Sequence, residues 1–78
     1  MMPPKNLSKK LKQIRLKAGL SKTAIVRALN YEQSPLYPSE ISQFERGERQ
    51  PSLLLALAYA RVGGISLDVL ADDELSLD

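Results

Sequence analysis

The sequence contains neither cysteine nor histidine among its 78 residues. The absence of cysteine excludes disulfide bonds, thiolate nucleophiles and cysteine-ligated metals. The absence of histidine removes the side chain that most often serves as a general base or a metal ligand. The chain also lacks a glycine-rich loop for phosphate and a convincing pair of catalytic carboxylates. The composition therefore argues against an enzyme and predicts neither a cofactor nor a metal.

Long apolar runs are missing as well. None approaches the roughly 20 residues that a membrane-spanning helix needs. The first residues, Met1 to Leu7, lack the apolar region of a signal peptide. A soluble, cytoplasmic protein is expected, with the length of one domain and a modest core.

Charge is distributed unevenly along the chain. Residues 1–50 carry ten lysines and arginines against four acidic residues, whereas residues 51–78 carry one arginine against five. A basic part and an acidic part suit a polyanionic partner that binds one face only. Mixed charge would also serve solubility alone, so charge by itself does not decide between these readings.

Apolar residues recur at helical spacing in most of the chain. A first helix is predicted to open at Asn6 or Leu7 and to end at Gly19, and a second to be N-capped by Ser21. A fourth helix is predicted over residues 52–62 and a short fifth one over residues 67–71. The inward positions of the first two helices are Leu7, Leu11, Ile14, Ala18, Ala24, Ile25, Ala28 and Leu29.

The most informative stretch is residues 37–51, which predicts a third helix. Pro38 fits the first helical turn, where its missing N–H costs nothing. Ile41, Phe44 and Glu45 share one face, which should turn inward. Gly47 can adopt positive φ and end the helix, and Pro51 can open the next one. The other face carries small and amide side chains flanked by arginines, which is chemistry suited to the major groove of DNA.

The run Ile41-Ser-Gln-Phe-Glu45-Arg-Gly47-Glu-Arg-Gln-Pro51-Ser, preceded by Gly19-Leu20-Ser21-Lys-Thr-Ala24-Ile25, resembles the lambda-repressor-like, Xre-type helix-turn-helix family. The resemblance covers roughly residues 7–70. It implies an all-α, five-helix domain over residues 7–71, between a flexible arm (1–6) and an acidic tail (72–78). It also implies sequence-specific binding of double-stranded DNA by a transcriptional regulator, most simply a repressor.

The resemblance also implies which side chains meet DNA. Gln43 is the strongest candidate for base reading, because its amide can bond adenine N6 and N7 together. Glu48 should point away from the phosphates. The remaining base-reading positions are Pro38, Ser39 and Ser42, and the phosphate-contacting positions are Lys22, Tyr37, Arg46, Arg49 and Gln50.

Two features concern how the reading helix is held. In the family pattern, the arginine at the position of Arg15 pairs with the glutamate at the position of Glu45, which would tie the first helix to the third. The eleven residues between Leu29 and Ile41 make a longer turn than the family usually has. Within this turn, Tyr31 is expected to pack on the core and Tyr37 to face DNA.

The fourth helix runs from Leu53 to Ala60 without a charged residue, and a helix that is apolar all round must be covered all round. The family's core positions fall on Leu53, Ala56, Leu57 and Ala60. Leu54, Leu55 and Ala58 would then face a second subunit in a homodimer or be covered by the tail through Leu75 and Leu77.

Two other functions agree with the same residues. One is the antitoxin of a toxin–antitoxin pair, which would hold a protein partner through the fourth helix or the acidic tail. The other is a protein-interaction module that has lost DNA binding, an alternative supported by the long turn and by Pro38.

Overall fold

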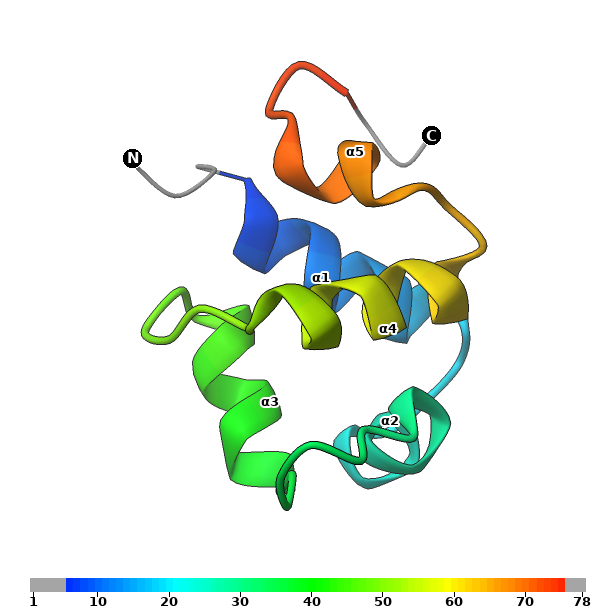
Figure 1. Cartoon of the computed structure of the whole chain (residues 1–78), viewed down its shortest axis with the longest axis vertical. Helices are drawn as coiled ribbons and strands as arrows, with labels where there is room; N and C mark the ends of the chain where they lie inside the picture. Colours follow the sequence, from blue (N-terminus) through cyan, green and yellow to red (C-terminus); the bar gives the residue numbers. More distant parts are fainter. Residues whose placement is uncertain (1–5, 76–78) are drawn as a thin grey trace.

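The computed structural model describes residues 6–75, which form five α-helices and no strand (Figure 1). The all-α, five-helix prediction is confirmed. Most of the expected N-terminal arm, and Leu77 of the expected tail contact, lie outside the described residues. No helix within residues 6–75 has the length and apolar character to cross a membrane. The helices are α1 (Leu7–Lys17), α2 (Lys22–Leu29), α3 (Pro38–Glu45), α4 (Leu53–Gly63) and α5 (Leu67–Ala71).

The core is made from one face of each helix. α1 packs on α3, α4 and α5, and α4 packs on α1, α2 and α5. α2 and α3 pack against each other at the end of the molecule opposite α5 (Figure 1). The buried apolar side chains are Leu7, Leu11, Ile14, Ile25, Leu29, Ile41, Phe44, Leu55, Tyr59, Ala60 and Leu70.

The buried side of α1 differs from the prediction at two positions. Ala18 is exposed, because it is the C-cap residue beyond the last full turn. Lys10, which is not among the predicted inward residues, is only 4% exposed. Its ammonium donates hydrogen bonds to the carbonyls of Val69 (2.6 Å) and Asp72 (2.7 Å) at the end of α5. α5 therefore covers this side of α1, and Lys10 satisfies carbonyls that a helix end leaves free.

The start and the buried side of α4 also differ from the prediction. Ser52 is the N-cap residue, and its Oγ accepts a hydrogen bond from the Leu55 N–H (3.2 Å). Pro51 therefore precedes the helix and does not open it. Leu55 and Tyr59 are buried, whereas Leu53 is 71% exposed. The assignment of Leu53 to the core was wrong, and so was that of Leu55 to a subunit interface. Ala28 of α2, expected to face inward, is exposed too.

The long turn between α2 and α3 is anchored to the core. It starts at Asn30, whose φ of 48° is left-handed, a conformation that asparagine tolerates. Tyr31 and Leu36 pack against the buried cluster. The Tyr31 hydroxyl also hydrogen bonds with Ser52 Oγ at the start of α4 (2.9 Å). The turn therefore links α2 to α4 before it reaches α3.

Candidate nucleic-acid interface

α3 has a buried back and an accessible front. Ile41 and Phe44 are only 0% and 3% exposed, and they hold the helix on the core. Pro38 and Ser39 are exposed, whereas Ser42 and Gln43 are half-buried. The four positions suggested for base reading thus keep full or partial exposure, whereas Ile41 and Phe44 do not.

Both ends of α3 are fixed by local hydrogen bonds. At the start, Glu40 Oε1 accepts the Tyr37 N–H (3.1 Å), while the Tyr37 side chain stays 59% exposed. At the end, Gly47 has a φ of 73°, and its N–H donates to the Phe44 carbonyl (3.2 Å). The Glu48 N–H donates to the Gln43 carbonyl (2.9 Å). This pair of bonds is the Schellman ending that a left-handed glycine permits, and it sets the turn that carries the flanking arginines.

Arg15 and Glu45 are in contact across the α1–α3 interface. Arg15 Nε lies 2.7 Å from Glu45 Oε2, and Nη2 lies 3.1 Å from Oε1, which makes a bidentate pair. Arg15 Nη1 also donates to the Leu20 carbonyl (3.1 Å). The side chains keep only 12% and 6% of their exposure, and the hydrogen bonds with Glu45 raise the pKa of Arg15 above its usual value. The pair ties α3 to α1 and to the segment that leads into α2.

The arginines beside α3 already have carboxylate partners. Arg49 Nη1 lies 3.2 Å from Glu40 Oε2. Arg46 donates through Nε to Glu48, so this carboxylate lies beside one of the arginines expected to contact phosphate. This hydrogen bond lowers the pKa of Glu48 and raises that of Arg46. Both pairs are exposed on at least one side, where ion pairs are weak and exchangeable. The Arg46–Glu48 pair could have been predicted from the sequence, because the two opposite charges lie only two residues apart.

Lys22 is the first residue of α2 and is half-buried. The N-cap residue Ser21 accepts the Ala24 N–H on its Oγ (3.0 Å). No acidic residue occupies the first turn of α2. A lysine beside the positive end of a helix dipole is suited to an anion.

Tyr59 lies behind the interface. Its side chain is 0% exposed, and within residues 6–75 its hydroxyl has no hydrogen-bond partner. Burial raises the pKa of Tyr59, and the charge of Glu45 raises it further. Tyr59 could not be singled out from the sequence, because a tyrosine in an apolar run gives no sign of the charged pair near it.

The raised pKa of Tyr59 predicts a loss of stability in alkali. Above about pH 10 a tyrosine of the unfolded chain loses its proton, while buried Tyr59 keeps its own. The free energy of unfolding should therefore be undiminished below that pH and fall above it, by up to about 1.4 kcal/mol per pH unit. Urea unfolding on both sides of this pH should show a shallower fall for Tyr59→Phe than for the wild type. Tyr37→Phe, at an exposed position, should follow the wild type, and identical slopes for all three proteins would contradict the prediction.

Two helices joined by a turn, the second with a buried back and an accessible polar front, define a helix-turn-helix domain. A family model described as helix-turn-helix matches residues 11–70. The chain belongs to this family, in its Xre, lambda-repressor-like form, and is a DNA-binding domain of the kind that regulates transcription. Comparisons with curated proteins and with solved structures gave no match.

Proposed function

We propose that the protein binds a specific sequence of double-stranded DNA through α3 and represses transcription there. The orientation of α3 is the observation that carries this proposal, because burial of Ile41 and Phe44 leaves its polar face accessible. The Gln43 amide reads adenine by paired hydrogen bonds to N6 and N7. Ser39 and Ser42 bond less selectively. Pro38 offers only shape, for example to a thymine methyl.

Affinity comes from contacts with phosphate, which position the domain without reading sequence. Lys22 binds one phosphate at the start of α2, and Arg46 and Arg49 bind others by exchanging their carboxylate partners for the DNA backbone. Tyr37 and Gln50, both exposed, add neutral hydrogen bonds.

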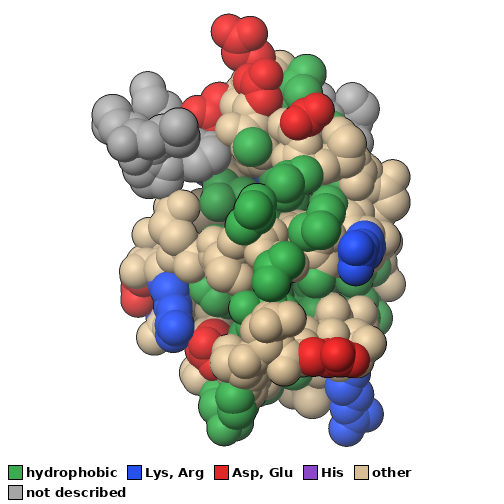
Figure 2. Space-filling model, viewed as in Figure 1, with side chains coloured by type: hydrophobic (Ala, Val, Ile, Leu, Met, Phe, Trp, Pro, Cys, Tyr) green, Lys and Arg blue, Asp and Glu red, His purple; other side chains and the backbone are tan. Residues whose placement is uncertain are grey.

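Asp68, Asp72, Asp73 and Glu74 lie on α5 or directly after it, at the end of the molecule opposite α3 (Figure 1), where Figure 2 shows a group of acidic side chains. Glu40 and Glu48 lie beside α3, but each is paired with an arginine there. The acidic α5 end therefore favours an orientation in which α3 faces the polyanion.

Gln43→Ala and Lys22→Ala should weaken DNA binding in different ways. Loss of a bidentate base contact costs about 1–3 kcal/mol of discrimination at one base pair, so Gln43→Ala should relax the preference at that position. Lys22→Ala should weaken binding to all sequences alike and reduce the salt dependence by about one phosphate contact. Gel-shift titration on DNA selected from random sequences measures both effects. If both variants bound like the wild type, this docking of α3 would be wrong.

A single module of this size buries only about 600–1,000 Å² on DNA. We therefore propose that the repressor acts as a homodimer on two half-sites about 34 Å apart, so that each α3 enters a successive turn of the major groove.

A further inference from the structure

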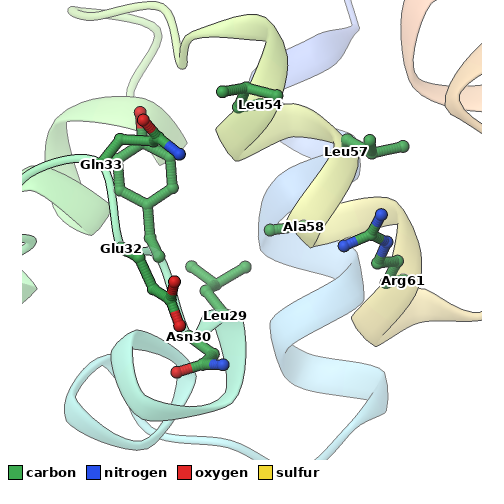
Figure 3. A pocket seen from close by; sticks show the side chains of 9 residues that line it. Leu29, Asn30, Glu32, Gln33, Leu54, Leu57, Ala58 and Arg61 are labelled. Carbon is green, nitrogen blue, oxygen red and sulfur yellow. The ribbon is translucent and has the colours of Figure 1, made fainter.

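A groove of about 300 Å³ separates α4 from the turn after α2. Figure 3 shows Leu54, Leu57 and Arg61 on the α4 side, with Glu32 and Gln33 across from them on the turn. Leu29 and Ala58 form its apolar floor. The groove lies outside the front of α3 and the residues proposed for phosphate contact.

The α4 side of the groove has the pattern of a helix-packing surface. Leu54, Leu57, Ala58 and Arg61 follow one another at i, i+3, i+4 and i+7, which places them on a single face. Leu54 is 52% exposed, and apolar side chains gather over α4 on this side of the molecule (Figure 2). Exposed apolar side chains that share one helix face beside polar and charged residues are typical of an association site.

Two opposite charges stand on the two sides of this groove. Glu32 belongs to the turn and Arg61 to α4 (Figure 3). Neither forms an ion pair within the part of the chain that the structure describes, unlike Glu40, Glu45 and Glu48. A half-turn about an axis along the groove brings the α4 side of one copy against the turn side of another. Arg61 of each copy then meets Glu32 of the other, so the surface is complementary to itself.

We propose that this groove binds a second copy of the chain in a two-fold symmetric dimer. Leu54 and Leu57 of each copy fill the groove of the other, and two Arg61–Glu32 pairs fix the register. An isologous interface needs this self-complementarity. The proposal deepens the proposed function and rests on it for its purpose, since the dimer supplies the second half-site contact. The association itself requires no DNA.

The free dimer is expected to be weak. An interface of ordinary size removes about 800 Å² from each partner, which is about a sixth of the 5137 Å² exposed by this chain. The proposed interface therefore uses both sides of the groove, α4 and the turn. Dimerisation should therefore depend on concentration, and sedimentation equilibrium at several concentrations is the suitable measurement.

Charge reversal tests both the surface and its symmetry. Arg61→Glu alone and Glu32→Arg alone should each weaken self-association by about tenfold or more, because symmetry converts two attractive contacts into two repulsive ones. An equimolar mixture of the two variants should dimerise again, because each variant carries the charges that the other lacks. Lys12→Glu makes the same charge change on α1, away from the groove, and should leave association unchanged.

The outcomes separate the dimer from DNA recognition. A wild type that stays monomeric throughout, or a mixture that associates no better than the single variants, would overturn the proposed interface. The circular dichroism melts of the variants should match that of the wild type, since both positions are exposed. The variants should still bind an isolated half-site like the wild type. A wild type that dimerises without binding DNA would refute the proposed function and leave the interface standing.

Discussion

Glu45→Met is expected to lower the free energy of unfolding by about 3–5 kcal/mol, because it strands a charge in a nearly closed site. Arg15 has only 12% of its side chain exposed, and both of its contacts with a carboxylate end on Glu45. Without that carboxylate, only the Leu20 carbonyl remains as a partner. The guanidinium must then stay buried without a counter-charge or pull α1 away from α3. Urea denaturation measures the loss.

A double substitution distinguishes a buried pair from two independent charges. When both members of a buried pair are replaced by apolar residues of similar volume, stability is often unchanged. Arg15→Met with Glu45→Met should therefore recover most of what Glu45→Met loses. Glu48→Gln, which breaks an exposed pair, should change stability little. If Glu45→Met cost no more than Glu48→Gln, the ion pair would not be what holds α3 in register.

Local signals in the sequence predicted most of the helix ends, because capping depends on nearby residues. Ser21 and Gly47 occupy the cap positions expected from their chemistry. The inward face of α3 was predictable for a similar reason, since Ile41 and Phe44 are its only large apolar residues. Their spacing leaves one orientation that buries both. The part of the candidate site that depends on this orientation could thus be predicted from sequence.

The register of α4 could not be predicted in this way. A run of leucines and alanines has no polar face, so periodicity does not favour one side for burial. Leu55 is buried and Leu53 is exposed because of how α4 meets α1 and α2, and these contacts are invisible in the local sequence. The pairing of Arg49 with Glu40 was missed for a related reason, because the two residues come together only through the turn that follows α3.

Lys10→Met should cost about 3 kcal/mol, which is a large effect for a lysine. Its ammonium donates to two carbonyls at the end of α5, Val69 O and Asp72 O. Each hydrogen bond from a charged donor contributes about 1.5–3 kcal/mol, and a carbonyl left unpaired adds a penalty. Methionine keeps the apolar stem, so the loss should come from the ammonium. Urea denaturation of Lys10→Met, compared with that of Lys9→Met at an exposed neighbouring position, measures the contribution of the Lys10 ammonium to stability. Equal stability of the two variants would mean that the hydrogen bonds from Lys10 to Val69 and Asp72 do not form in solution.

The loss of stability in Lys10→Met should also be confined to one end of the molecule. α5 packs on α1 and α4, whereas α2 and α3 pack against each other at the far end (Figure 1). Amide exchange in Lys10→Met should therefore accelerate first in α5, while the amides of α3 keep their protection. Glu45→Met should do the reverse, because its ion pair joins α1 to α3. The helix proposed to read DNA thus depends on a buried ion pair, whereas α5 depends on a buried lysine, and the two variants should separate these effects residue by residue.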